Sequence, residues 1–288
     1  GFAVIIFIYF LRILIRAFAW KLSVYEPYNL TMRDTTSAVI IGEAMSSIIP
    51  LGILISGTSK AVAVRHRLPL VVGLSSIATE NLFYSLITGL FIILGATVFV
   101  RSFELEESWI WTLDALIVVT ILLILFMIFI VVRQWHFLSS ICESLYKRGI
   151  LKQFLETGRL QVRLFENLIY GFYRRYPKRF LPILSAQIFY HLLGIFEVWF
   201  IINRLSETSA SVYSAFLLET VSRTITIVFK LVPFLIGVDE AGAQFVTETL
   251  ALGAGLGVTL AIIRKGRILF WAVVGITLIL KRGLSLKE

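Results

Sequence analysis

The chain has 288 residues, of which 58% are hydrophobic and only 16% are charged. A soluble domain carries about 25% charged residues, so this composition excludes a water-soluble globular protein and indicates a polytopic membrane protein. The net charge of +9 does not indicate nucleic-acid binding, because the basic residues flank apolar segments, where they mark cytoplasmic loops and meet anionic lipid.

In chain order, the sequence predicts an all-α bundle whose apolar segments differ in length and in the number of charged residues that they contain. A helix needs about 20 apolar residues to cross a bilayer. By this measure we predict spans over residues 2–20, 70–100, 110–132, 182–202 and 268–280. The chain begins at Gly1, already inside an apolar run, and we therefore expect a fragment from which an upstream helix is missing.

Two segments between these spans look like broken, re-entrant helices. Residues 36–49 form a small-residue-rich helix that is interrupted at Pro50, and a basic turn follows over residues 60–67. Residues 215–232 form a second helix, which is interrupted at Pro233 and followed by a Gly- and Ala-rich helix over 241–262. Unwound backbone is expensive in lipid, so such breaks indicate a protein-lined interior.

The middle segment, residues 133–181, is strongly basic. It contains ten Lys or Arg residues against three Glu, with apolar residues at helical spacing. We interpret it as an amphipathic helical hairpin on the cytoplasmic membrane surface, and a plain solvated connector is the alternative. The positive-inside rule then places 60–67 inside and the acidic loop 101–108 outside. The topology of residues 212–267 stays open.

The two broken segments suggest an internal repeat within a single transmembrane domain. Pro50 precedes Glu80 by 30 residues, and Pro233 precedes Arg264 by 31. We therefore divide the chain into a first repeat-like half (1–132), the basic segment and a second half (182–288), which an inverted arrangement would relate. Interrupted helices at matching places in two halves indicate the substrate site of a transporter.

Charged residues at membrane depth are the candidate site residues, because each costs several kcal/mol unless it is paired or hydrated. Glu219 and Arg223 have the i, i+4 spacing of a helical ion pair, and Arg12 and Arg16 place two cations on one face. Taken singly, the cations could lie near helix ends and snorkel to headgroups; taken together they favour a polar interior. The predicted substrate path contains Arg12, Arg16, Glu43, Pro50, Lys60, Glu80, Glu219, Arg223, Pro233, Gly237, Glu240 and Arg264.

Catalytic and metal-binding motifs are missing from the sequence. Cys142 is the single cysteine, the three histidines are far apart, and there is no H-E-x-x-H, G-x-S-x-G or Walker loop. Gly253-Ala-Gly-Leu-Gly257 has the composition of a close helix contact rather than of a phosphate loop. We therefore expect no cofactor and no metal, and a non-enzyme rather than an enzyme.

The order of short motifs resembles a flippase-like integral membrane family that contains the lysylphosphatidylglycerol synthase transmembrane region. The resemblance runs from about Arg12 to Lys281. It rests on R-A-F-A-W-K-L (16–22), G-E-x6-P (42–50), S-G-T-S-K-A (56–61), P-F-L-I-G-V-D-E-A-G (233–242) and L-G-A-G-L-G-V (252–258) followed by Arg264. The family usually has an Arg after the residue that matches Glu80, where this chain has Asn81. Lysyl-transferring members carry a further cytosolic domain that this sequence lacks, so the resemblance implies lipid translocation or a lipid-handling scaffold rather than aminoacyl transfer.

Three hypotheses follow for a multi-pass protein of the cell membrane whose partners are membrane lipids. The leading one is translocation of an anionic or polyprenyl-phosphate lipid between leaflets. The second is a membrane-embedded enzyme that acts on lipid-linked substrates with Asp239 and Glu240 as its carboxylates. The third is an accessory subunit that recruits a lipid-modifying or glycosyltransferase enzyme through residues 133–181.

Overall fold

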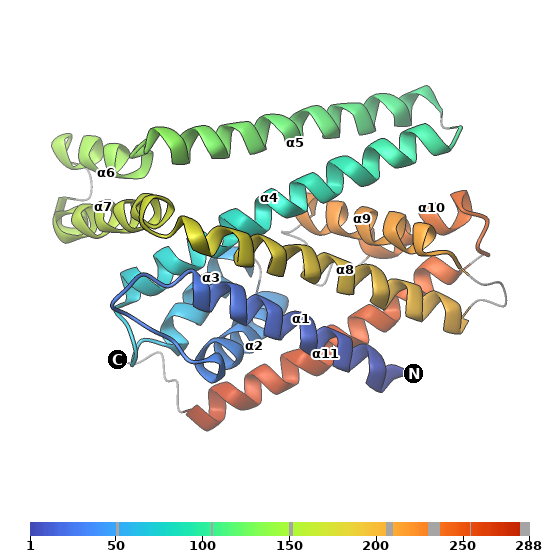
Figure 1. The fold of residues 1–288 in the computed structure, drawn as a ribbon, viewed down its shortest axis with the longest axis horizontal. Coiled ribbons are helices and arrows are strands. Elements are labelled where there is room, and N and C mark those ends of the chain that lie inside the picture. Colours follow the sequence, from blue (N-terminus) through green and yellow to red (C-terminus); the bar gives the residue numbers. More distant parts are fainter. Residues whose placement is uncertain are drawn as a thin grey trace.

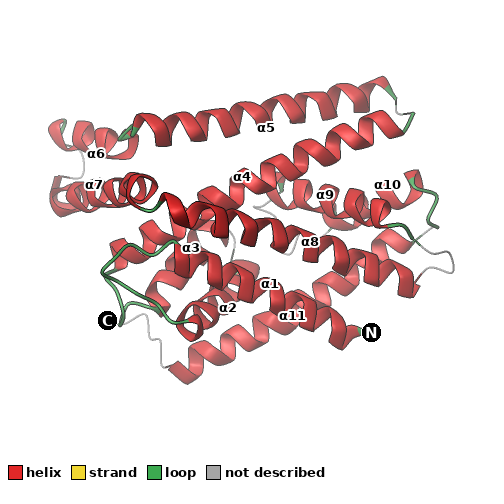
Figure 2. Ribbon diagram, in the orientation of Figure 1, coloured by secondary structure: helices red, strands yellow, loops and turns green. Residues whose placement is uncertain are grey.

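The computed structural model of the protein consists of helices joined by short loops (Figures 1 and 2). It describes residues 1–49, 52–104, 106–149, 152–205, 210–229, 237–253 and 255–282. The first helices are α1 (Phe2–Leu22), α2 (Met32–Ile48), α3 (Gly52–Ala63), α4 (Leu70–Ser102), α5 (Glu107–Arg133), α6 (Phe137–Lys147) and α7 (Lys152–Arg175). A short 3-10 turn, η1 (Pro177–Arg179), leads to α8 (Phe180–Leu205), α9 (Val212–Val228), α10 (Val238–Thr249) and α11 (Leu256–Arg282).

Four helical segments are long and apolar enough to cross a membrane: α1, α4, α5 and the continuous run from η1 through α8. They coincide with four of the five predicted spans and confirm a polytopic all-α bundle. The fifth prediction, a separate short span over 268–280, is wrong, because α11 is one helix of 27 residues that also includes Arg264 and Arg267. The cations lower the mean hydropathy of the N-terminal half of this helix, and hydropathy alone therefore predicts only its C-terminal half as a span.

The prediction of one helix over residues 241–262 is also wrong. The helix α10 ends at Thr249, and Gly253 and Gly255 adopt positive φ angles of 117° and 79° in the turn before α11. Such φ values are open to glycine at little cost, which explains why the turn is glycine-rich. Only Gly257 lies in a helix, where it touches the backbone of Ala243 in α10 as a close-packing glycine.

The described helices form two units of the same order: α1 to α4, and α8 to α11. In each unit a long helix precedes two short helices, and a second long helix follows. Figure 1 shows that α1 and α8 run in opposite directions, as do α4 and α11. It also shows α2 and α3 toward the end where α6 and α7 lie, and α9 and α10 toward the opposite end. The two short-helix pairs therefore enter the bundle from opposite ends.

Packing between the units is reciprocal. The long helix α11 of the second unit packs on α2 of the first, and α4 of the first packs on α9 of the second. Each contact includes a glycine that allows close approach: a Cβ on Gly275 would overlap Ala44, and a Cβ on Gly95 would overlap Thr220. Small residues allow helix backbones to approach closely within a membrane.

The helices α5, α6 and α7 lie outside these two units. The apolar helix α5 packs chiefly on α4 and contains no buried residue, so its surface is available to lipid. The helices α6 and α7 pack together as the predicted hairpin. Glu166 of α7 accepts hydrogen bonds from the backbone N–H groups of Leu138 and Ser139, at 2.9 and 3.3 Å, and so caps the first turn of α6.

The apolar core is divided into clusters. One cluster joins α1 to α2, α3, α4 and α11 around Trp20, and another joins α8 to α9, with Phe99 of α4 and Leu260 of α11. The same helices also contribute buried charged side chains from both units, which form the candidate site.

Candidate functional site: a buried charge cluster between the two units

Arg12 of α1 is the central cation of this cluster. Its side chain is 1% exposed, and its two terminal nitrogens lie 3.1 Å from Glu197 of α8 and 3.4 Å from Glu219 of α9. Both carboxylates are fully buried. The sequence allowed Arg12 to snorkel to a lipid headgroup; the structure places it between two carboxylates in the interior instead.

Two further arginines reach the same carboxylates from α11. Arg264 pairs with Glu219 and Arg267 pairs with Glu197, and the side chains of both arginines are less than a tenth exposed. Their i, i+3 spacing places them on one face of the helix. Arg264 also donates to the hydroxyl of Ser222 at 2.6 Å. Snorkelling is therefore the wrong reading for Arg264 too.

Glu219 is the most highly coordinated carboxylate among the described residues. Besides Arg12 and Arg264 it accepts from Arg223 one turn later in α9, at 2.8 Å from Nε and 2.7 Å from Nη2. The predicted i, i+4 pair is therefore formed. Gly194 of α8 makes room for this carboxylate, because a Cβ there would overlap it. A buried carboxylate bears a large desolvation cost, and three guanidinium partners offset it.

Arg16 binds a separate set of acceptors one turn after Arg12. Its Nη2 lies 3.2 Å from a carboxylate oxygen of Glu80 and 3.2 Å from the amide oxygen of Asn81, both in α4. Gln187 of α8 donates to the same carboxylate at 2.9 Å. Asn81, which departs from the resembled pattern, thus serves as an acceptor for an arginine supplied by α1.

Glu43 and Lys60 belong to the α2–α3 pair. The hydroxyl of Tyr9 in α1 donates to Glu43 at 2.9 Å. Lys60 is 4% exposed and its side chain passes over Gly42 of α2. The sequence placed Lys60 at the start of a basic surface turn, but α3 continues to Ala63 and carries Lys60 into the interior.

Tyrosine rings line the cations. The guanidinium of Arg267 lies 4.0 Å from the ring centre of Tyr9, that of Arg12 lies 4.3 Å from Tyr190, and that of Arg16 lies 4.7 Å from Tyr84. Rings within about 6 Å of a cation attract it through their quadrupole, and more strongly where water is excluded. These three arginines are thus stabilised by a tyrosine ring as well as by a carboxylate.

The remaining predicted residues lie apart from this cluster or outside the described residues. Glu240 pairs with Lys265 and accepts from the backbone N–H of Gly237 at 2.9 Å, so it caps its own helix. This contact occupies part of the α10 N-terminus that an anionic ligand would otherwise use. Pro50 and Pro233, the predicted break points, lie outside the described residues.

The carboxylates of the enzyme hypothesis do not converge. Asp239 accepts from Ser222 at 3.0 Å, whereas Glu240 binds Lys265 and Gly237. Within the described ranges, no group of three His, Cys, Asp or Glu side chains could hold a metal ion. The geometry therefore gives no support to a carboxylate pair in this position.

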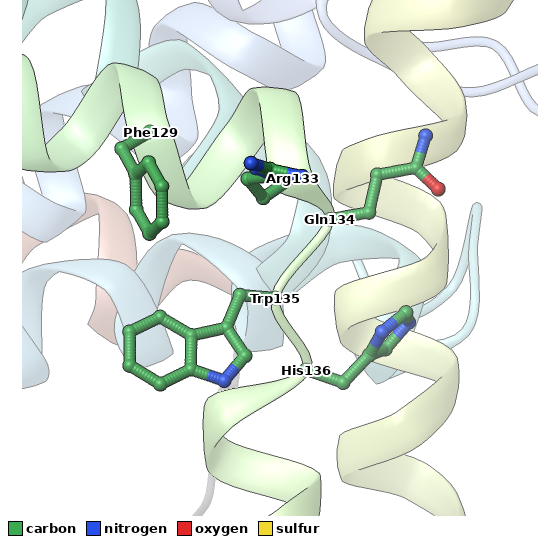
Figure 3. Close-up of a pocket in the computed structure, with 5 residues that line it drawn as sticks. All are labelled: Phe129, Arg133, Gln134, Trp135 and His136. Carbon is green, nitrogen blue, oxygen red and sulfur yellow. The ribbon is translucent and has the colours of Figure 1, made fainter.

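A second feature lies at the surface, where α5 meets α6. A hollow of about 490 Å³ is lined by Phe129, Arg133, Gln134, Trp135 and His136 (Figure 3). Figure 3 shows Phe129 and Trp135 on one side of the bend and His136 on the other. Aromatic and basic residues at the end of a span are typical of a membrane interface.

Comparison with known proteins agrees with this architecture. Residues 2–276 match the family described as the lysylphosphatidylglycerol synthase TM region. The chain belongs to this family. No match was found among curated proteins or among solved structures. Membership makes the chain a multi-pass membrane protein with a lipid-related role, as the motif resemblance implies.

Sequence reasoning missed Arg267, Tyr9 and Tyr190 as members of this charge cluster, and it counted Glu197 among the charges at membrane depth without placing it on the substrate path. Arg267 had a usable signal, because it follows Arg264 by three residues and therefore shares its helix face. The sequence gives no such signal for the tyrosines, because aromatic residues are common in apolar spans. Their importance comes from which cations lie over their rings.

Proposed function

We propose that this protein binds the polar headgroup of an anionic or polyprenyl-phosphate lipid at the buried charge cluster and translocates the lipid between leaflets. The observation that carries the proposal is a set of five buried or nearly buried arginines with their carboxylate partners, contributed by two oppositely directed helical units. Buried intramembrane charges are rare and are usually retained for a functional reason.

The cost of moving a headgroup explains why such a cluster supports translocation. A charged group at the bilayer centre costs several kcal/mol, and this cost is the main barrier to unassisted lipid flipping. Fixed guanidiniums held by carboxylates offer preorganised donors at that depth, and the carboxylates balance the cations when no headgroup is bound. The acyl chains can remain in the bilayer while the headgroup exchanges water for these donors.

Two oppositely directed units also suit alternating access. The α2–α3 pair enters from one end and the α9–α10 pair from the other, and the cluster draws on both units. Transporters built from inverted repeats commonly rock one unit against the other around a central site. Here α11 packs on α2, and α4 packs on α9. A movement of one unit would therefore shift the short helices at both ends of the bundle.

The direct test is a lipid translocation assay in liposomes that contain the purified protein. Fluorescent phosphatidylglycerol and a polyprenyl phosphate serve as probes, and their exchange between leaflets is followed by bleaching of the outer leaflet. We expect faster exchange than in protein-free liposomes. Equal rates with and without protein, for both probes, would show that the proposal is wrong.

We further propose that the end of the bundle carrying α6 and α7 faces the cytoplasm of a cell whose plasma membrane contains the protein. This end carries the basic hairpin, as the positive-inside rule requires. Cys142 of α6 is a natural reporter, since it is the single cysteine and is partly exposed. A membrane-impermeant maleimide should label it only in lysed cells, whereas Glu106→Cys in a Cys142→Ser background should label in intact cells.

A further inference from the structure

Two arginines of the cluster differ from the other three in their exposure. The side chains of Arg16 and Arg223 are 14% and 13% exposed, whereas those of Arg12, Arg264 and Arg267 are 1%, 7% and 6% exposed. The first two therefore keep a small accessible surface, and the last three keep less.

Each of these two more exposed arginines also has a terminal nitrogen without an acceptor. Every hydrogen bond of Arg16 to the described residues comes from Nη2, so its Nη1 has no acceptor there. Arg223 uses Nε and Nη2 on Glu219, and its Nη1 has no acceptor within the described part of the chain. Unused donors also occur on the more deeply buried arginines, since the Nε atoms of Arg12, Arg264 and Arg267 have no partner among the described residues. Exposure together with a free terminal nitrogen therefore distinguishes Arg16 and Arg223.

Arg16 and Arg223 converge on one pair of aromatic rings. Their guanidinium carbons lie 5.9 and 5.5 Å from the ring centre of Tyr190. Tyr84 packs edge-on against Tyr190 at 5.8 Å and lies under Arg16 at 4.7 Å. Neither tyrosine hydroxyl has a hydrogen-bond partner among the residues that the structure describes. Four helices, two from each unit, thus bring unused guanidinium and hydroxyl donors together.

We propose that Arg16 and Arg223, with the hydroxyls of Tyr84 and Tyr190, bind the phosphodiester group of an anionic phospholipid. This assignment rests on the proposed function and names the chemistry of its substrate. A phosphodiester carries one negative charge and offers two acceptor oxygens, which match the forked donors of two guanidiniums. Arg12, Arg264 and Arg267 then have a different role: they hold Glu197 and Glu219 in place.

The test compares lipid binding by the full chain with binding by variants in which the carboxylate beside the substituted arginine keeps its other hydrogen-bond partners. In Arg16→Gln the Glu80 carboxylate keeps Gln187, and in Arg223→Gln the Glu219 carboxylate keeps Arg12 and Arg264. Tyr84→Phe removes only a hydroxyl. Arg101→Gln, at the exposed end of α4, is the matched control for loss of one arginine.

Binding of phosphatidylglycerol is measured by native mass spectrometry of the detergent-solubilised protein, with thermal unfolding as a check on folding. Loss of one charge-assisted contact should weaken binding roughly tenfold to hundredfold in Arg16→Gln and in Arg223→Gln. Tyr84→Phe should weaken it by roughly threefold to tenfold, and Arg101→Gln should leave it unchanged. Wild-type affinity in folded Arg16→Gln and Arg223→Gln would overturn the assignment.

A second arm separates lipid phosphate from free phosphate. Inorganic phosphate is added as a competitor at millimolar concentration, and we expect phosphatidylglycerol to remain bound because its acyl chains add apolar contacts. Displacement of the lipid by inorganic phosphate at that concentration would overturn the lipid assignment. If the variants lose binding but the wild-type protein shows no translocation, the site stands and the proposed function fails.

Discussion

Arginine is abundant in two regions of this protein, the buried charge cluster and the α6–α7 hairpin, and it is largely buried in the first and largely exposed in the second. In the cluster between the units, arginines are desolvated and each lies against a carboxylate. In the α6–α7 hairpin, Arg148, Arg163, Arg174 and Arg175 are exposed, and the ion pairs of Glu143 with Lys147 and Arg159 are long, at 3.8 and 3.5 Å. Burial makes pairing obligatory, whereas exposure leaves the cations available for lipid phosphates.

The largest expected difference concerns the loss of one carboxylate from each region. Glu219→Gln removes the charge that faces three arginines, and a buried charge without its partner costs about 3–5 kcal/mol. We expect a large fall in the thermal unfolding temperature or in the yield of folded protein. Glu143→Gln in α6 is the control, because exposed pairs contribute about 0–1 kcal/mol. Equal effects of the two substitutions would contradict the comparison.

A pair of glycine substitutions should act with opposite signs. Gly194→Ala in α8 places a methyl group against the carboxylate of Glu219, which its arginines hold fixed, and such overpacking costs about 1–3 kcal/mol. Gly158→Ala in α7 meets no atom within 4 Å. Since alanine is the better helix former by about 1 kcal/mol, this variant should be slightly stabilised. Thermal unfolding of both in one detergent makes the comparison.

Among the charged residues of the described hairpin, Glu166 is the exception, because it is buried at 4% exposure. Its carboxylate accepts backbone N–H bonds at the start of α6, where the helix dipole favours negative charge. Glu166→Gln should destabilise the hairpin by about 1–2 kcal/mol. Faster hydrogen exchange confined to α6 is the expected readout, and unchanged exchange there would show that the cap is unimportant.

The smallest expected effect is a pH dependence at the start of α2. Burial tends to raise the pKa of Asp34, but hydrogen bonds from Thr31 and the nearby charges of Arg67 and His66 outweigh it, so its pKa lies below the ordinary value. Stability from Asp34 is therefore complete above about pH 3.9 and is lost as the pH falls through the lower folded pKa.

Asp34→Asn tests this dependence. It should cost about 0.3–1 kcal/mol at neutral pH, from the lost charge in the first turn. The difference in unfolding temperature between wild type and variant should shrink as the pH is lowered below 4. A constant difference across that range would show that the Asp34 charge is not responsible.

The sequence by itself determined the membrane class, four of the spans, the broken short helices and the basic hairpin. These features follow from the local density of apolar and charged residues, and each can be recognised within a segment of about 20 residues. It also determined the Glu219–Arg223 pair, because an i, i+4 spacing fixes the two side chains on one helix face.

Only the tertiary structure decided how the charges are shared. Nothing local relates Arg12 to Glu197 or Glu219, which lie 185 and 207 residues away. The length of α11 was decided in the same way, since its cations become acceptable in an apolar helix only when carboxylates of α8 and α9 pair with them. A buried charge is stable only beside its partner, and the partner is chosen by the packing of the two units.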